Sequence, residues 1–418
     1  MKRFPRAGRL WTLASLVLIA CWLSPCIPPS HLRPLPESTP TPAAAAYLPR
    51  QVWILLSALE NKPDCQVQLA PAAGGTARRL DFQMRGGQVV SSDGRQGVSL
   101  VTPLPAPFEI KGRQYLGNLK VQAHKKGGLR VLVEIGLEHY VEGVVAAELP
   151  LWSSLPAELQ AQSVAVRTYA VSALSRQGMG PSGFLWDGVQ DQAYHGNYRP
   201  GDSRGERSAA VRLRRAVETT RGQVLLQGKG LLDVRYHASC GGQTADRSTI
   251  FPGTQPSALV TCTPCAKRAR SEAGVPAKRR PVTWTLQLSK PECLALVDRW
   301  GLGTRLLKLA PSKLDAGARW QTVRLTGNKR AADVPLDLLR KQLGYGRFKS
   351  GRILSVRPAT GTPNADGLTL TGLGRGHGVG LCQEGIHDYA AQGMDSQAIL
   401  EHYYPGSRVE RLGHDPRR

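Results

Sequence analysis

Two sequence patterns that mark common enzyme classes are absent from this chain of 418 residues. It contains no G-x-x-x-x-G-K-[ST] phosphate loop and no H-E-x-x-H pair of metal ligands. No internal repeat is visible either. The sequence therefore gives no support to a P-loop nucleotidase or to a metalloprotease of the H-E-x-x-H type.

A hydrophobic run of transmembrane length is also missing near the N-terminus. The apolar stretch Leu10–Leu23 has fourteen residues, whereas a transmembrane helix needs about 20. Because it follows a basic start, residues 1–23 are interpreted as a bacterial export signal. The segment LIAC resembles a lipoprotein processing site that would leave Cys21 acylated; ordinary cleavage and an uncleaved anchor are the alternatives. Residues 24–50, rich in Pro and Ala, are interpreted as an extended tether. We expect the protein to work outside the cytoplasm, secreted or anchored to the membrane through its N-terminus.

Acidic residues are few, since 31 Asp and Glu stand against 55 Lys and Arg and the formal net charge is +24. This excess predicts an anionic partner, but charge alone does not choose among nucleic acid, anionic lipid and an acidic wall polymer. Aromatic residues make up only 6% of the chain and do not cluster with basic ones. With the export signal, this predicts no nucleic-acid partner. The basic segment 266–280 is interpreted as a solvated loop, with attraction to an anionic wall or lipid surface as the alternative.

The eight cysteines are too unevenly spaced for the disulfide framework of a small secreted domain. Three of them form, with one histidine, an H-x-x-C and a C-x-x-C pair: His237, Cys240, Cys262 and Cys265. Thiolates and an imidazole at this spacing suit a tetrahedral structural Zn²⁺. A disulfide from Cys240 to Cys262 or Cys265 is the first alternative in an exported protein, and free thiols are the second. A closed four-ligand site would stabilise the fold without taking part in catalysis.

Local patterns predict strands first and then helices. Short apolar runs separated by Gly, Asn and Asp indicate a β-rich region over residues 51–125. A strand is predicted over Leu129–Ile135, followed by a helix that begins near Leu137. That helix should end near Glu148, because Pro150 disfavours a helical conformation at the residue before it.

A second helix is predicted from Pro156 to about Arg176. Gln162 and Tyr169 share one face of it, so both could line a common cleft. Further elements are predicted as a helix over 207–222, strands over 223–227 and 231–239, and a terminal helix over 394–406.

Several motifs occur in a fixed order: YVEGVVAAELP with LPAELQAQSVAVRTYA, DGVQDQAYHG with AVETTRGQVLL, GRGHGVGLCQEG, and ILEHYYPG. Together they resemble the stage II sporulation protein D family over residues 126–412, which leaves 413–418 as a tail. The resemblance implies an exported bacterial protein that acts on peptidoglycan, with an α+β fold whose helices and strands surround a glycan-binding cleft. Sporulation members of that family are lytic transglycosylases, and some relatives are described as enhancers of wall amidases.

The acid that the resemblance implies is the glutamate of an E-x-P segment, here Glu148. Ordinary glycoside hydrolases need two carboxylates, whereas a lytic transglycosylase uses neither water nor an enzyme nucleophile. Glu148 would protonate the oxygen between N-acetylmuramate and N-acetylglucosamine, and would then accept the proton of the muramyl C6 hydroxyl, which leaves a 1,6-anhydro end. Apolar neighbours and the negative end of a helix would keep this acid protonated. On spacing alone, the alternative is a solvated carboxylate at a helix end.

Five further residues are candidates for contacts with the saccharide: Gln162, Arg167, Tyr169, His377 and Gln383. Arg167 suits the muramyl carboxylate through its forked donors, with a solvated or ion-paired helix arginine as the alternative. The glycines of GRGHGVGLCQEG permit close approach of backbone to a ligand, with His377 and Gln383 on the cleft wall. A purely structural loop around a buried His377 is the alternative there. Cys382 stands where the family usually has serine.

The sequence thus predicts an exported peptidoglycan lytic transglycosylase that binds glycan strands and needs no cofactor for catalysis. The alternative function is a non-catalytic, glycan-binding activator of an N-acetylmuramoyl-L-alanine amidase, which implies a wall amidase or another envelope protein as partner.

Overall fold

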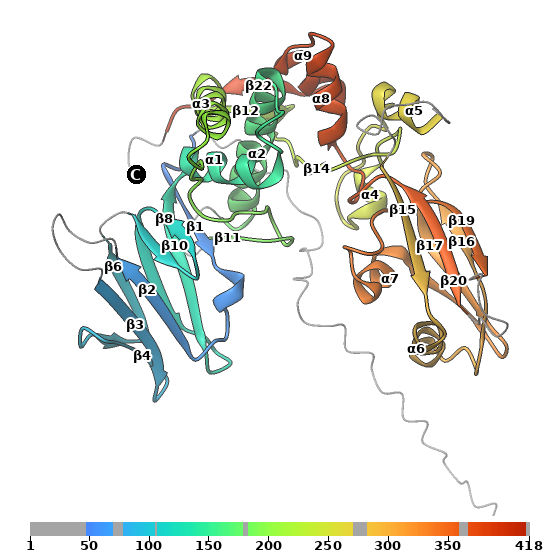
Figure 1. The fold of residues 1–418 in the computed structure, drawn as a ribbon, viewed down its shortest axis with the longest axis horizontal. Helices are drawn as coiled ribbons and strands as arrows, with labels where there is room; N and C mark the ends of the chain where they lie inside the picture. The colour runs from blue at the N-terminus through green and yellow to red at the C-terminus, as the bar shows by residue number, and fades with distance from the viewer. Residues whose placement is uncertain are drawn as a thin grey trace, which may run out of the picture. The chain divides into compact units, whose positions relative to one another are not determined.

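The computed structural model describes residues 47–69, 78–104, 107–178, 183–270, 282–358 and 367–414 (Figure 1). The expected export signal, residues 24–46 of the tether, segment 271–281 and residues 415–418 of the tail lie outside the described residues. Helices and several open sheets occur together, so the predicted α+β class is confirmed. In the part of the chain that is described, no helix combines the length and the apolar character needed to cross a bilayer.

A five-stranded sheet joins segments from both sides of residue 125. Its order is β11 (Leu185–Trp186), β1 (Gln51–Leu55), β10 (Leu129–Gly136), β9 (Asn118–Ala123) and β6 (Ser99–Pro103). Alternate residues of β10, from Leu129 to Ile135, are buried on one face, which is the period-two pattern of a strand. The boundary expected between residues 125 and 126 therefore falls between two paired strands, β9 and β10.

The predicted β-rich region also contains a six-stranded antiparallel sheet. Its order is β5 (Gln96–Gly97), β4 (Gln88–Ser91), β3 (Arg78–Arg85), β2 (Asp64–Leu69), β7 (Phe108–Ile110) and β8 (Arg113–Tyr115). Val67 of β2 and Phe82 of β3 are fully buried and belong to the same hydrophobic cluster as β10. One short 3-10 helix, η1 (Ser57–Leu59), follows β1. The β-rich prediction for this region is confirmed.

Three helices follow, and the first two have the predicted positions. α1 (Leu137–Glu148) begins directly after β10 and ends before Pro150. α2 (Pro156–Arg176) has proline in its first turn. α3 (Arg204–Thr219) begins three residues before the predicted helix, because Ser203 caps it by accepting a hydrogen bond from the backbone N–H three residues later.

The second helix, α2, is enclosed by other elements. It contacts α1, α3, β12 (Gln223–Gln227), α8 (Gln383–Ala391) and α9 (Ser396–Tyr403). Every residue from Glu158 to Leu174 except Gln160 is buried. A helix that is packed on all sides leaves no face for an open cleft. The expected cleft-lining stripe is therefore corrected: Gln162 is 0% exposed and Tyr169 is 5% exposed.

Short elements around the C-terminal helices differ from the prediction. β12 pairs with β13 (Gly230–Leu231) and β22 (Arg408–Arg411), and β14 (Tyr236–His237) pairs in parallel with β21 (Leu381–Cys382). The strand expected over 231–239 is thus broken into two short pieces. Two helices, α4 (Arg247–Ile250) and α5 (Thr263–Arg270), also form. α5 covers residues 266–270 of the expected solvated loop, so that part of the loop is helical.

Residues 282–373 contain a second hydrophobic core, which includes Trp284, Val323 and Phe348. One antiparallel sheet has the order β15 (Thr283–Leu288), β20 (Leu368–Leu373) and β19 (Arg352–Pro358), and another has the order β16 (Leu306–Leu314), β17 (Trp320–Gly327) and β18 (Ala331–Pro335). Two helices, α6 (Lys290–Trp300) and α7 (Leu336–Leu343), complete this part.

Candidate functional site

Glu148 is half-buried in the last turn of α1, and two donors from distant segments hold its carboxylate. Oε1 accepts a hydrogen bond from the backbone N–H of Ala193 at 3.3 Å, and Oε2 accepts one from Nε2 of Gln383 at 3.3 Å. Ala193 lies in the connection between β11 and α3, and Gln383 is the first residue of α8. Three segments that are remote in sequence therefore meet at one carboxyl group.

Burial raises the pKa of the Glu148 carboxyl above its usual value of 4.5. The hydrogen bonds from Gln383 and Ala193, and the nearby side chains of His195 and Arg375, act in the opposite direction but do not cancel the effect of burial. The setting therefore favours retention of the proton and also offers donors to the anion that forms when the proton leaves. A carboxyl with both properties can act first as an acid and then as a base.

The loop that supplies the Ala193 N–H is fixed by its neighbour Gln192. The buried Gln192 amide donates to Oη of Tyr140 at 3.1 Å and accepts from the hydroxyl of Tyr236 at 2.9 Å. Tyr140 belongs to α1 and Tyr236 to β14. Sequence reasoning missed these contacts. The motif DGVQDQAYHG was visible, but a backbone donor leaves no side-chain signature.

Of the five residues expected to contact the saccharide, Gln383 is the one that hydrogen-bonds to Glu148. Arg167 is fully buried and forms a bidentate pair with Glu138, with Nε–Oε1 at 2.9 Å and Nη2–Oε2 at 2.5 Å. Its Nη1 donates to the carbonyl of Gln223 at 3.1 Å. A guanidinium that is enclosed and occupied in this way cannot reach a substrate carboxylate, so the structure corrects that expectation.

The remaining three residues are also held within the fold. Tyr169 donates to Oδ1 of Asp191 at 2.7 Å. Both amide atoms of Gln162 are buried and lack a hydrogen-bond partner among the described residues. His377 is half-buried, and its Nδ1 accepts from the N–H of Val379 at 3.0 Å. These contacts favour the structural interpretation of the glycine-rich loop at His377.

A second candidate site consists of four buried cysteines: Cys240, Cys262, Cys265 and Cys382. Their Sγ atoms all lie within 4.8 Å of one another, and the Cys265–Cys382 pair is 3.7 Å apart. None of these four cysteines forms a disulfide in the structure. The alternative of a disulfide from Cys240 to Cys262 or Cys265 is therefore not what the structure shows.

The four-sulfur group differs from the predicted ligand set in one member. Cys382 takes the position expected for His237, because the parallel pairing of β14 with β21 sets these two residues opposite each other. Nδ1 of His237 lies 3.1 Å from the carbonyl oxygen of Val379. Sequence spacing did not reveal Cys382, since 117 residues separate it from Cys265.

Hydrogen-bond donors surround the sulfur atoms. The N–H of Cys240 donates to Sγ of Cys382, and the N–H of Gly242 donates to Sγ of Cys240, both at 3.2 Å. The fully buried Arg319 donates through Nη2 to the carbonyls of Cys240 and Gln243. Hydrogen bonds with Cys262, and to a smaller extent with Cys265, hold the pKa of the Cys240 thiol well below its usual value. The four sulfur atoms could hold one tetrahedral metal ion, because Zn–S bonds of about 2.3 Å place ligand sulfurs ~3.8 Å apart.

Comparison with known proteins agrees with the resemblance seen in the motifs. Residues 125–226 match the family model described as SpoIID, stage II sporulation protein. An uncharacterized protein of Brachyspira hyodysenteriae is 26% identical over 303 residues, which cover 72% of this chain and 73% of that protein. Stage II sporulation protein D of Bacillus subtilis is 25% identical over 281 residues, 66% of this chain and 74% of that protein. The amidase enhancer of Bacillus subtilis is 27% identical over 345 residues, 72% of this chain but only 45% of that protein. The chain is therefore similar to the stage II sporulation protein D family, and residues 125–226 are the part that the family model matches.

Proposed function

We propose that this protein is an extracytoplasmic lytic transglycosylase that cleaves peptidoglycan glycan strands with Glu148 as its single acid and base. The observation that carries the proposal is the Glu148 carboxyl itself. It is half-buried, its pKa is raised by burial, and it is held between the Ala193 N–H and the Gln383 amide. The export signal expected at residues 1–23 and the net charge of +24 suit work on an acidic wall polymer.

In the proposed reaction, protonated Glu148 donates its proton to the oxygen that joins N-acetylmuramate to N-acetylglucosamine. The bond from this oxygen to the muramyl anomeric carbon breaks, and the C6 hydroxyl oxygen of the same muramate forms a new bond to that carbon. The hydroxyl proton passes to the Glu148 carboxylate, which is then ready for another cycle. No water is consumed, and the products are a 1,6-anhydromuramyl end and a free N-acetylglucosamine end.

The two donors to Glu148 have a defined part in this sequence. Burial favours the protonated acid at the start, and the bonds from Ala193 and Gln383 stabilise the carboxylate after the first proton transfer. A hydrogen bond to a charged group is stronger than one to a neutral group. Both donors therefore help more at the stage where Glu148 is charged than in the resting enzyme.

The alternative function is a non-catalytic activator of an N-acetylmuramoyl-L-alanine amidase. The relative named amidase enhancer supports it. Here the wall amidase would be the partner, and this protein would bind glycan without cleaving it. The two functions differ in one respect that can be measured, namely whether new 1,6-anhydro ends depend on Glu148.

The test uses the purified full-length protein in detergent, intact peptidoglycan and glycan strands stripped of stem peptides. The wild type is expected to produce 1,6-anhydromuramyl ends, measured by mass spectrometry, and Glu148→Gln is expected to produce none above background. Glu401→Gln, which alters an exposed helix carboxylate, is the matched control and should match the wild type. Absence of these ends with the wild type on both substrates would refute the transglycosylase. Stimulation of a purified wall amidase by both the wild type and Glu148→Gln would then support the activator.

We also propose a structural Zn²⁺ ion bound by Cys240, Cys262, Cys265 and Cys382. The spacing of the four sulfurs and their burial support it. Backbone N–H groups that donate to two of the sulfurs would stabilise thiolates. A buried guanidinium, Arg319, lies against the Cys240 carbonyl, and four thiolates around one divalent ion would supply negative charge to balance it. The ion would hold α5, β14 and β21 together and would take no part in the proton transfers.

A further inference from the structure

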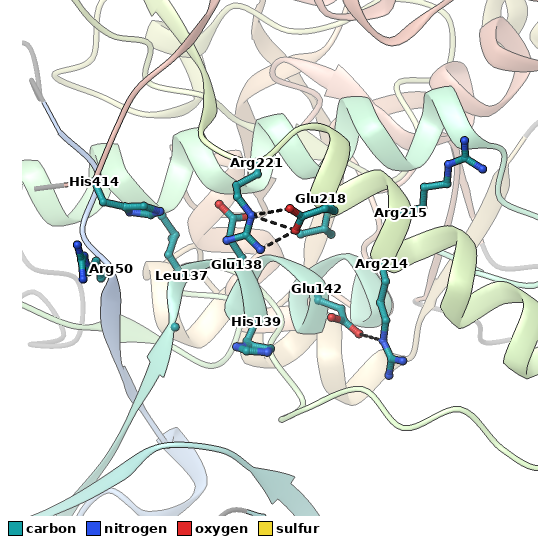
Figure 2. A pocket seen from close by; sticks show the side chains of 12 residues that line it. Arg50, Leu137, Glu138, His139, Glu142, Arg214, Arg215, Glu218, Arg221 and His414 are labelled. Carbon is teal, nitrogen blue, oxygen red and sulfur yellow. Dashed lines mark hydrogen bonds and ion pairs between the residues drawn. The ribbon is translucent and has the colours of Figure 1, made fainter.

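A cavity of about 720 Å³ lies at the end of α1 opposite Glu148 (Figure 2). The first turns of α1 form one wall, the C-terminal half of α3 forms another, and Arg50 and His414 complete the lining. Its volume is within the usual range for ligand sites. Of the α1 residues in the lining, Glu142 is nearest to Glu148, six residues or about 9 Å away along the helix axis. Glu148 itself does not line the cavity, which is therefore treated as a different site.

Charged side chains dominate this cavity, and the positive ones are in excess. Glu142 pairs with Arg214 at 3.2 Å, and Glu218 pairs with Arg221 at 2.6 Å, as the dashed lines in Figure 2 show. The third carboxylate of the lining, Glu138, is bound by the buried Arg167. Every carboxylate that lines the cavity is thus already neutralised by an arginine.

Two further arginines of the lining, Arg50 and Arg215, have no carboxylate partner among the described residues. Both are exposed. In Figure 2 they lie far apart on the two sides of the labelled group, with Arg214 and Arg221 between them. A ligand that contacted both would need at least two anionic groups.

Polar groups without a partner are also present at the cavity. Nδ1 of His414 is buried and has no hydrogen-bond partner among the described residues, although His414 lines the cavity. Gly136, which precedes α1, supplies no side-chain cap to the helix. Within the described part of the chain, the Arg50 carbonyl accepts a hydrogen bond from the N–H of Leu137 at 2.9 Å, and no side chain caps the first N–H groups of α1.

We propose that this cavity binds an extended polyanion, through phosphate or carboxylate groups that contact Arg50 and Arg215. Arginine suits both groups, because its planar fork can donate two parallel hydrogen bonds to either. A phosphodiester polymer and a polycarboxylate share this chemistry, and the two are distinguished by the probes below. The proposal does not depend on Glu148, and its test contains no glycan.

The test is isothermal titration calorimetry of the full-length protein with tripolyphosphate, hexa-L-glutamate and inorganic phosphate. At least one of the two multivalent probes is expected to bind with one site per chain and at least tenfold more tightly than inorganic phosphate. The stronger probe identifies the phosphate or the carboxylate source. The double variant Arg50→Ala/Arg215→Ala should weaken that binding tenfold or more.

The matched control is Arg330→Ala/Arg357→Ala, which removes the same charge from two exposed arginines in the 282–358 part. It should bind the probe like the wild type. Equal weakening in both double variants would mean that the net charge of +24 attracts the probe without a site, which would overturn the proposal. Failure of both multivalent probes to bind the wild type would overturn it as well. Circular dichroism and thermal melting of each variant exclude loss of fold as the cause.

Discussion

Nε2 of Gln383 lies 3.3 Å from Oε2 of Glu148, although 235 residues separate the two in sequence. Gln383 opens α8, and the same helix carries His387, whose Nδ1 lies 2.9 Å from Oε2 of Glu158 near the start of α2. One helix therefore bonds to the end of α1 and to the beginning of α2. The position of the proposed acid therefore depends on the packing of α8 against α1 and α2.

Gln383→Ala is expected to slow formation of 1,6-anhydro ends by about tenfold or more. A hydrogen bond to a charged group contributes roughly 1.5–3 kcal/mol, and Gln383 donates to the Glu148 carboxylate. Because this bond lowers the Glu148 pKa, its loss should also move the high-pH limb of the pH–rate profile to higher pH. The measurement is the rate of end formation across pH. Gln392→Ala, at the exposed far end of α8, should leave rate and profile unchanged; an unaltered profile in Gln383→Ala would contradict the assigned contact.

Glu148→Gln should stabilise the fold increasingly as pH rises. The carboxyl has a pKa above 4.5 in the folded protein because burial penalises its charge, so its contribution to stability is fully present below its unfolded pKa. That contribution is lost as pH rises through the folded pKa. Glutamine does not titrate, so the variant lacks this pH dependence.

The measurement is the melting temperature of the variant minus that of the wild type, by differential scanning fluorimetry. This difference should grow as pH rises from the unfolded pKa through the folded pKa of Glu148, and should then level off. A difference that shrinks with rising pH would show that Glu148 is more stable as the anion, and Glu401→Gln should show no such trend.

Removal of the proposed metal should destabilise the fold by several kcal/mol, since structural zinc binding is coupled to folding. Elemental analysis of the wild type is expected to give one zinc per chain, and Cys382→Ser should lose it while His237→Ala keeps it. Cys65→Ser is the control, because Cys65 is buried away from the cluster and burial raises the pKa of its thiol to about 12, which keeps it protonated. If His237→Ala lost the zinc while Cys382→Ser retained it, the result would contradict the four-cysteine site. It would instead support the ligand set predicted from sequence, which includes His237.

Local sequence was sufficient for the elements around Glu148 because their ends are set by neighbouring residues. Pro150 stops α1 after Glu148, and Pro156 starts α2, so both helices have the predicted bounds. The motif at residues 374–385 also contains Gln383, whose Nε2 lies 3.3 Å from Oε2 of Glu148. The contact with the saccharide that the sequence predicts for Gln383 stays a prediction.

Helical spacing was insufficient for Gln162 and Arg167, because it reports which residues share a face but not what covers that face. Elements from distant parts of the chain pack around α2, including α8 and α9 from its end. In the same way, Cys382 reaches the other sulfurs only through the pairing of β14 with β21. Contacts of this kind arise from tertiary packing, and no short motif encodes them.

Arg167 is expected to contribute to stability and not to substrate affinity. Breaking a buried ion pair by removal of one partner costs about 3–5 kcal/mol, and the Arg167–Glu138 pair is enclosed, with the arginine 0% exposed. Arg167→Met should therefore lower the free energy of unfolding in urea by this amount, while the KM for stripped glycan strands stays that of the wild type. Arg408→Met, which breaks the exposed pair with Glu410, should change stability by about 1 kcal/mol or less. A raised KM with unchanged stability in Arg167→Met would instead assign Arg167 to the glycan.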